Sequence, residues 1–452
     1  METLSQVLIL VIFAVMFIVI TIGKIHRYIP ALAGAVLTLL VLIFVFRNMD
    51  TAVAILNFSE IGKLTFWVPG KEHLESHGIN WQTVLFITGM MTMVEGLGAA
   101  GFFRWLCLSV AKLVHYKIVP IFIAFFIIAA LLSMFIDSIT VMLFLASVTI
   151  EMSKLLKFDP VPMIIAEIFA ANTGGSATMA GDPPNIIIGT AYGFNFTDFL
   201  TNTAPIAWAG VLLAMVFFYF VFRKTLKALS GTGVNDMVIQ YPEPASAIND
   251  LDLFRKNSVI FIFVIVLLIT HAMTGISVAL IGIIAAAMTL LTAGKSARKI
   301  INRLDWRTLL FFIGLFVVVG GLESTGALKA FANLIQGSSK GNFFTMTSII
   351  LWISVFMSAI VDNIPFAATM VPVVANLATN VTKLHTLSWA LALGADIGGN
   401  ATPIGASANV VGTAIAEREG YPISWGKFLK YAASATLLVV SLCWLLIFII
   451  YF

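Results

Sequence analysis

Residues 172–185, NTGGSATMAGDPPN, interrupt an apolar stretch that runs from residue 161 to residue 191. Paired glycines, an aspartate and paired prolines each break a helix or are costly in hydrocarbon. We therefore expect a broken helix whose unwound backbone is buried by protein or lines a wet cavity. Asp182 before Pro183 predicts the N-cap of a second half-helix. The same residues also fit an ordinary loop that ends in a helix start.

A second copy of this pattern, DIGGNATPIGASAN, covers residues 396–409. Gly174 and Gly398 are 224 positions apart, as are Asn185 and Asn409. Further upstream the spacing between matching residues of the two halves changes by one residue, from 224 to 225 positions. A helix break at the same place in each half is typical of transporters built from two structural repeats. We predict a first repeat over 1–222, a cytoplasmic linker over 223–257 and a second repeat over 258–452.

The composition is that of a polytopic membrane protein. Of 452 residues, 60% are hydrophobic and 11% are charged, and the mean hydropathy is +1.02, which is typical of several membrane spans. The sequence has no stripe of basic residues of the kind that would indicate a nucleic-acid partner. The two cysteines, Cys107 and Cys443, have neither zinc nor disulfide spacing. We expect no cofactor beyond a coupling ion.

The charges of the loops predict how the chain crosses the membrane. Loop 294–307 holds five Lys or Arg residues against one Asp, which indicates the cytoplasmic side. Counting spans from there puts the charge-mixed loop 47–81 and both termini outside. An odd number of crossings per repeat gives the halves opposite orientations, so we predict an inverted-topology repeat and alternating access in the inner or plasma membrane.

Two pairs of apolar runs have an acidic residue at their junction. The pair over 119–150 meets at Asp137-Ser138, and the pair over 343–378 meets at Asp362-Asn363. Each pair fits either two full spans or a re-entrant hairpin, because both leave the flanking loops on the same sides. Both aspartates also fit the simpler role of capping the second helix of the pair.

The apolar runs contain acidic residues and no Lys or Arg. Buried acids need protons or metal cations to neutralise them, which favours a cation as substrate or coupling ion. Asp182 has Ala406 as its repeat partner and Asp396 has Asn172, so the two halves differ chemically at both places. Either aspartate also fits a structural role, as do the remaining acids. The full set is Glu95, Asp137, Glu167, Asp182, Asp362 and Asp396.

Small polar residues surround both breaks. Their hydroxyl, amide and freed carbonyl oxygens suit a hard cation such as Na⁺. The same groups, with the half-helix N-termini, also suit a carboxylate or another oxyanion. The candidate ion- and substrate-binding residues are Asp137, Ser138, Asn172, Thr173, Gly174, Gly175, Ser176, Thr178, Asp182, Asn185, Asp362, Asn363, Asp396, Gly398, Gly399, Asn400, Thr402, Ser407 and Asn409.

Three segments carry a resemblance to a known family: MFIDSITVMLFLASVTIEMSKLLKFDP, AEIFAANTGGSATMAGDPPNIIIGTA and GGNATPIGASANVVGTA. They resemble the signature segments of the arsenite permease and sodium/proton antiporter (ArsB/NhaD) branch of the ion transporter superfamily, and most of all its P-protein-like permeases. The likeness covers nearly the whole chain.

The resemblance implies an all-α homodimer in the lipid membrane, with two re-entrant hairpins and two broken helices in each subunit. Scaffold and transport domains, each drawn from both repeats, would work by an elevator-like movement. The family pattern also implies ion and substrate binding at the tips Asp137 and Asp362 and at both breaks, where we expect Na⁺ at Asn172, Thr173, Asn400 and Thr402.

From these observations we predict a secondary transporter rather than an enzyme, and Na⁺/H⁺ antiport first. The alternatives are a Na⁺- or H⁺-coupled carrier of a carboxylate or other oxyanion, and an arsenite or antimonite efflux permease. Asn400-Ala401-Thr402 departs from the Ser-Asn-Thr of the carboxylate carriers, and no cysteine lies near a break to capture arsenite. An intramembrane aspartyl protease using Asp182 would leave the duplication unexplained. A channel could share the re-entrant hairpins, and saturable turnover that depends on a coupling gradient would exclude it.

Overall fold

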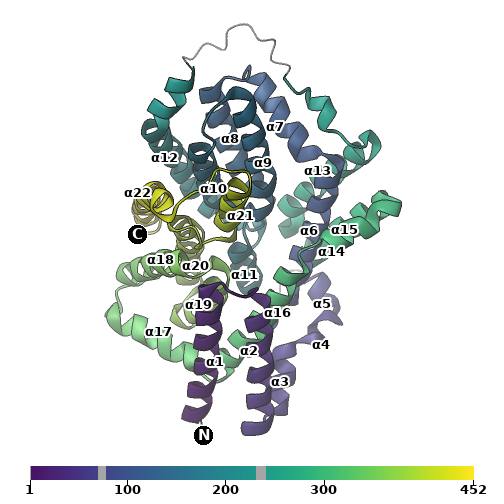
Figure 1. Ribbon diagram of the computed structural model, residues 1–452. Coiled ribbons are helices and arrows are strands. Elements are labelled where there is room, and N and C mark those ends of the chain that lie inside the picture. The colour runs from purple at the N-terminus through teal and green to yellow at the C-terminus, as the bar shows by residue number, and fades with distance from the viewer. Residues whose placement is uncertain (1, 70–77, 231–240) are drawn as a thin grey trace.

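The computed structural model describes residues 2–69, 78–230 and 241–452, and every regular element in these ranges is a helix (Figure 1). Nine of the described helices are long and apolar enough to cross a membrane. This confirms the prediction of an all-α polytopic membrane protein.

Both predicted helix breaks are present. In the first half α10 (Val161–Gly175) ends and α11 (Pro183–Tyr192) begins after an irregular segment. In the second half α20 (Val381–Gly398) is followed by a single 3₁₀ turn and then by α21 (Ser407–Arg418). The break is shorter than predicted, because residues 172–175 and 396–398 still belong to the preceding helices.

A glycine that was expected to unwind the helix instead allows close packing. A Cβ atom on Gly174 would lie 2.4 Å from the backbone of Ala130 in α8 (Ile118–Ser133), and one on Gly398 would lie 2.5 Å from that of Val355 in α18 (Phe343–Ile360). The glycines therefore serve helix-to-helix approach, which compensates for their low helix propensity.

The two junctions that hold acidic residues are sharp turns between helices. Asp137 caps α9 (Ser138–Leu156) and Asp362 caps α19 (Asn363–Leu377), each accepting a hydrogen bond from a backbone N–H. The capping role considered for them is thus confirmed. Helices α8 and α19 have 16 and 15 residues, fewer than the roughly 20 needed to cross the hydrocarbon core. This length favours hairpins over pairs of full spans.

The helices that surround the breaks and hairpins, together with the breaks and hairpins themselves, pack in two groups. In one group α6 (Trp81–Ala100) lies against α14 (Val278–Ala293), and α16 (Trp306–Ser324) lies against α2 (Tyr28–Leu40). In the other group α8 packs on α10, α18 on α20 and α21 on α9. Both broken helices and both hairpins belong to the second group, as expected for a transport domain, and the division into scaffold and transport domains stays a prediction.

Two amphipathic helices, α7 (Phe102–Leu113) and α17 (Ala327–Ser338), follow α6 and α16 and lead to the hairpins. The other described helices are α1 (Glu2–Ile22), α3 (Met49–Leu56), α4 (Phe58–Ile61), α5 (Leu64–Trp67), α12 (Phe196–Ser230), α13 (Leu251–Thr274), α15 (Ala297–Arg303) and α22 (Trp425–Tyr451), with a π-helical turn at Val41–Val45 and 3₁₀ turns at Pro244–Ala247, Gly294–Ser296 and Gly399–Ala401.

The predicted linker is partly helical. Helix α12 continues to Ser230 and α13 begins at Leu251, so both helices extend into the predicted linker range of 223–257. No proline or glycine lies between residues 222 and 230 to stop α12, which explains why polarity alone placed its end too early. Residues 231–240 lie outside the described part of the chain.

Candidate functional site

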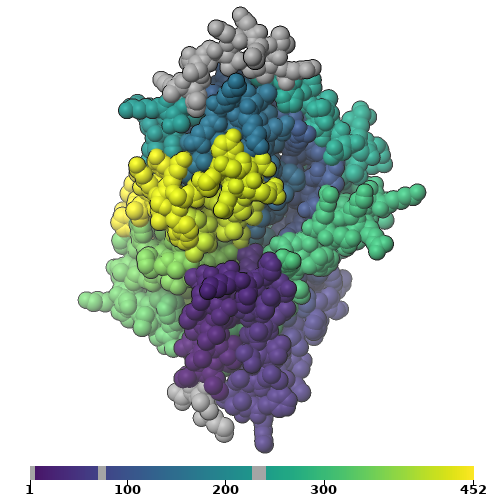
Figure 2. All heavy atoms as spheres, in the orientation of Figure 1, coloured from purple at the N-terminus to yellow at the C-terminus, as the bar shows by residue number. Residues whose placement is uncertain are grey.

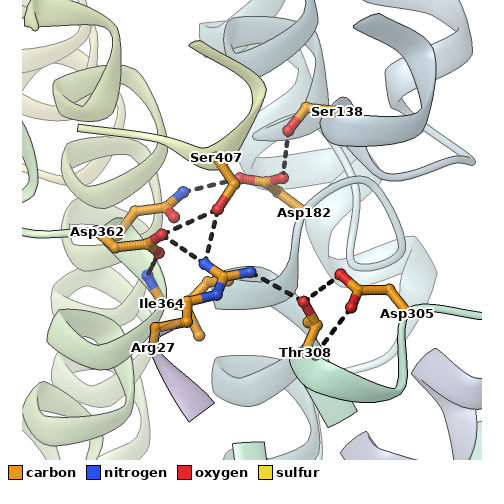
Figure 3. Close-up of polar contacts among 9 residues, drawn as sticks. Arg27, Ser138, Asp182, Asp305, Thr308, Asp362, Ile364 and Ser407 are labelled. Carbon is orange, nitrogen blue, oxygen red and sulfur yellow. Dashed lines mark hydrogen bonds and ion pairs between the residues drawn. The ribbon is translucent and has the colours of Figure 1, made fainter. Parts of the chain in front are cut away.

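Asp182 joins the two hairpin tips. Its Oδ1 atom accepts a hydrogen bond from Ser138 Oγ at 2.8 Å, and its Oδ2 atom accepts one from Asn363 Nδ2 at 2.9 Å (Figure 3). Ser138 begins α9 and Asn363 begins α19, while Asp182 precedes α11 and is only 3% exposed. Both tips therefore end at one buried carboxylate, which favours two hairpins over two pairs of full spans.

This geometry corrects the role predicted for Asp182. The residue occupies the N-cap position of α11, but its side chain makes no capping bond to that helix. Pro183 and Pro184 follow it and carry no N–H, so the first turn of α11 offers few donors to a capping carboxylate. The Asp182 side chain is therefore free to turn toward the hairpins.

Asp396 is the second buried acid of the site. It lies near the end of α20 with no exposed surface, and among the described residues neither of its carboxylate oxygens has a hydrogen-bond partner. The Asp182 charge acts on Asp396, and the side chains of Asp182, Asn185 and Asn363 lie close to its carboxylate without meeting strict hydrogen-bond geometry. A buried carboxylate without a donor is unfavourable unless it holds a proton or a cation.

A set of amides ties the two breaks together. Asn172 Nδ2 donates to Asn400 Oδ1 at 2.9 Å and to Asn409 Oδ1 at 2.8 Å, and Asn400 Nδ2 donates to Thr173 Oγ1 at 3.2 Å. All four residues are buried, with no exposed surface. The structure thus brings together Asn172, Thr173 and Asn400, three of the four residues where we expect Na⁺.

The fourth residue, Thr402, joins this set through its carbonyl oxygen, which accepts a hydrogen bond from Asn409 Nδ2 at 2.7 Å, and its side chain is engaged with the second hairpin. Its hydroxyl donates to the carbonyl oxygen of Ala359 at 2.5 Å, at the end of the second hairpin's first helix. Thr178 makes the matching bond to Met134 in the first half. Both threonines therefore hold a break against a hairpin. Ser176 instead makes a local bond within its own break, donating to the carbonyl oxygen of Thr173 at 2.7 Å.

The glycines of the two motifs pack against backbone. A Cβ on Gly175 would lie 3.3 Å from the carbonyl oxygen of Gly181, and one on Gly399 would lie 2.9 Å from that of Gly405. With Gly174 and Gly398 they allow the break, the hairpin and the broken helix to approach closely. Asn185 and Asn409 are also buried at their breaks and bond to the freed carbonyls.

The two hairpin tips differ in charge compensation. Asp362 Oδ2 forms an ion pair with Arg27 Nη1 at 2.6 Å and accepts a hydrogen bond from Ser407 Oγ at 2.9 Å. Asp137 instead accepts hydrogen bonds from the backbone N–H and the hydroxyl of Thr140. Within the described ranges no Lys or Arg forms an ion pair with Asp137.

Arg27 is the functional residue that sequence reasoning missed. It stands in the short polar segment before α2, which reads as an ordinary loop between two spans. Its guanidinium also donates to Ser407 Oγ at 2.7 Å and to Thr308 Oγ1 at 3.0 Å (Figure 3). It lies 4.9 Å from the ring centroid of Phe311. The only available signal was an arginine directly beside an apolar run.

Among the described residues, two further acids share no hydrogen bond with this cluster, although Glu95 is close enough to interact with the charge of Asp137. Glu167 on α10 is 1% exposed, and one of its oxygens accepts a hydrogen bond from Thr149 Oγ1 at 2.5 Å. Glu95 on α6 is partly exposed and interacts electrostatically with Arg303. Among the residues the structure describes, no three His, Cys, Asp or Glu side chains are grouped to hold a metal ion.

A family model described as citrate transporter (CitMHS) matches residues 9–394. An uncharacterised transporter of Mycobacterium tuberculosis is 35% identical over 83% of this chain and 87% of its own length. The P protein of Sus scrofa is 27% identical over 82% of this chain and 53% of its own length.

Among solved structures, that of the Alcanivorax borkumensis YdaH transporter, described as having an unusual topology, superposes with a TM-score of 0.52. It is 14% identical in sequence and covers 88% of both chains. At this identity the likeness concerns the fold alone.

Proposed function

This chain belongs to the citrate transporter (CitMHS) family, and we propose that it is an ion-coupled secondary transporter that exchanges a small cation, Na⁺ first of all, for protons. One observation carries the proposal. Two buried carboxylates, Asp182 and Asp396, lie close together at the point where both hairpins and both broken helices meet. Among the described residues no Lys or Arg is paired with either of them.

Exchange follows from competition at this acidic pair. Carboxylates without a basic partner are neutralised by a proton or by a metal cation, and the two cannot occupy the same oxygens together. Asn172, Thr173 and Asn400 supply further oxygen atoms where the two breaks meet, which suits a hard cation. In the proposed cycle only the neutralised site crosses the membrane, carrying Na⁺ one way and H⁺ the other.

The proposed movement is elevator-like. Hairpins, broken helices and the acidic pair belong to one packing group, while α2, α6, α14 and α16 form the other. Sliding of the group that contains the hairpins against the group of α2, α6, α14 and α16 would expose the site to either side in turn. The homodimer, the surrounding lipid, the extracytoplasmic termini and the placement within the ArsB/NhaD branch are part of this proposal, and the similarity to the P protein supports the last of them.

A second candidate is a cation-coupled carrier of a small carboxylate. The description of the family model favours it, and so does a difference between the two half-helices. Helix α11 begins with two prolines, which have no N–H, whereas α21 begins with Ser407 and Ala408, which have. The α21 end also lies beside Arg27, so it is the end that would favour an anion.

Proton flux in proteoliposomes tests the first candidate. Purified protein is reconstituted with a pH-sensitive dye inside, and Na⁺, Li⁺ or K⁺ is added outside. We expect cation-driven proton movement in the wild type and its loss in Asp182→Asn and in Asp396→Asn. The control, Asp252→Asn, removes an exposed acid paired with Lys256 on α13 and is expected to transport as the wild type does.

A wild type that gives no proton response to any of the three cations would rule out this function. The same vesicles would then be tested with labelled citrate under Na⁺ and proton gradients, where gradient-driven uptake would support the second candidate. Uptake of arsenite in that assay would support the efflux permease instead.

A further inference from the structure

The ion pair between Arg27 and Asp362 connects the two packing groups. Arg27 precedes α2, which packs on α1 and α16, and its Nη2 atom donates to Thr308 on α16. Its Nη1 atom reaches the tip of the second hairpin at Asp362 and the start of α21 at Ser407. In the space-filling view the N-terminal helices and the C-terminal segment lie next to each other on one face (Figure 2).

The first half of the chain has no counterpart of this ion pair. Gly89 and Gly314 are equivalent in the repeat, 225 positions apart. Gly282 of α14 lies against Gly89 as Ala31 of α2 lies against Gly314, so α14 corresponds to α2. Counting from these contacts puts Val278 in the place of Arg27, directly after Ser277, the uncharged N-cap of α14. An apolar valine at this position has no charge to offer Asp137, the acid at the first hairpin tip.

A small cavity lies beside Asp137, where no basic side chain pairs with the carboxylate in the described part of the chain. This cavity of about 40 Å³ is lined by Asp137 and Pro183, by Thr308, and by apolar side chains of α6. This volume is enough for a water molecule or a small ion and too small for an arginine side chain. At the second tip the equivalent carboxylate is already covered by a guanidinium.

From this asymmetry we propose that Arg27 acts as a cation fixed to the chain. The proposal rests on the proposed function. Arg27 takes the place of a second transported cation at Asp362, and so it sets how many cations the protein binds. An arginine keeps its charge at every physiological pH. Asp362 is therefore neutralised without Na⁺ or H⁺ for as long as the pair is closed.

Removing the guanidinium should create a cation site. In Arg27→Gln, Asp362 keeps the Ser407 hydroxyl as a neighbour and loses its only basic partner among the described residues. Its carboxylate then needs a proton or a metal cation, as Asp182 and Asp396 do. In the double variant Arg27→Gln/Asp362→Asn both charges are gone, and no additional cation is required.

Calorimetric Na⁺ titration of the purified protein is the first test. We expect Arg27→Gln to bind one Na⁺ more per subunit than the wild type, and the double variant to return to the wild-type number. Arg27→Lys, which keeps a cation at this place, should also give the wild-type number. Equal Na⁺ numbers in the wild type and Arg27→Gln would overturn the proposal.

Stability gives a second readout if Arg27→Gln folds poorly. We expect Na⁺ to raise its melting temperature more than that of the wild type, because the ion replaces the missing charge. Poor folding that Na⁺ does not restore would also count against Arg27 as a substitute cation. In vesicles ²²Na⁺ uptake should depend more steeply on membrane potential in Arg27→Gln.

The two proposals fail in different ways. Absence of cation-driven proton movement in the wild type removes the proposed antiport. The difference in Na⁺ number between wild type and Arg27→Gln is measured on purified protein without transport, and it decides the role of Arg27 by itself.

Discussion

Asn185 and Asn409 make the same pair of hydrogen bonds in the two halves of the chain. Each donates from Nδ2 to two carbonyl oxygens of its own break, at 2.7 to 3.2 Å: Gly175 and Thr178 for Asn185, and Gly399 and Thr402 for Asn409. These carbonyls lose their helical partners where the helix is interrupted. One amide thus stabilises each break.

We predict that Asn185→Ala and Asn409→Ala each lower the free energy of unfolding by about 1–3 kcal/mol, the range for leaving a buried polar group without its partner. Asn409→Ala should be the more severe, because Asn409 Oδ1 also accepts a hydrogen bond from Asn172. Denaturant unfolding in detergent measures both. Asn302→Ala, at an exposed position on α15, is the control and should change stability little.

Gly174→Ala and Gly398→Ala should destabilise the protein by about 1–3 kcal/mol each, the usual range for overpacking a core. Their Cβ atoms would meet hairpin backbone at 2.4 and 2.5 Å, and backbone yields less easily than a side chain. Gly337→Ala on α17 is the matched control, since nothing lies within 4 Å of its Cβ position. That change should be stabilising by up to about 1 kcal/mol. Destabilisation of all three alike would contradict the packing argument.

Thr149 and Glu167 should show strong energetic coupling. Thr149→Val leaves the buried Glu167 carboxylate without the one hydrogen bond that it has among the described residues, at an expected loss of about 1–3 kcal/mol. The double variant Thr149→Val/Glu167→Leu removes both polar partners and should recover much of that loss. Unfolding measurements on the four forms complete the cycle, and additive effects would show that the bond contributes little.

Cysteine labelling on intact cells tests the predicted orientation. The native Cys107 and Cys443 are 1% and 0% exposed, so they should not react in the folded protein. Leu64→Cys lies in the loop predicted outside and Lys299→Cys in the basic loop predicted inside, both at exposed positions. An impermeant maleimide should label the first directly and the second only after permeabilisation. Labelling of both in intact cells would contradict the inverted topology.

Local signals predicted the helices, the breaks and the turns at Asp137 and Asp362. Proline, glycine and hydrophobic runs act over a few residues, so their effect can be read from the sequence. Residues 172–175 were wrongly expected to unwind, because the packing of Gly174 against α8 is a tertiary contact that overrides propensity. The family resemblance grouped Asn172, Thr173 and Asn400, which are in hydrogen-bond contact in the structure, and their binding of Na⁺ stays a prediction.

The ion pair between Arg27 and Asp362 was beyond prediction from the sequence. The two residues are 335 positions apart, and their repeat equivalents, Val278 and Asp137, do not pair, so the duplication gave no hint of the contact. Asp182 was placed correctly at a helix start, but its bonds to both hairpin tips depend on how the halves pack against each other. Contacts between repeats, unlike those within one, carry no local pattern.

Arg27 and Asp362 belong to the same polypeptide, and this has a consequence for how the protein responds to its surroundings. Both charges belong to one chain, so the guanidinium competes for the carboxylate at an effective concentration that the fold sets and the medium does not dilute. A dissolved cation would have to displace this guanidinium before it could bind the Asp362 carboxylate. In the proposed transporter the occupancy of the second carboxylate is therefore a property of the folded chain and does not follow the salt concentration of the medium while the pair is closed.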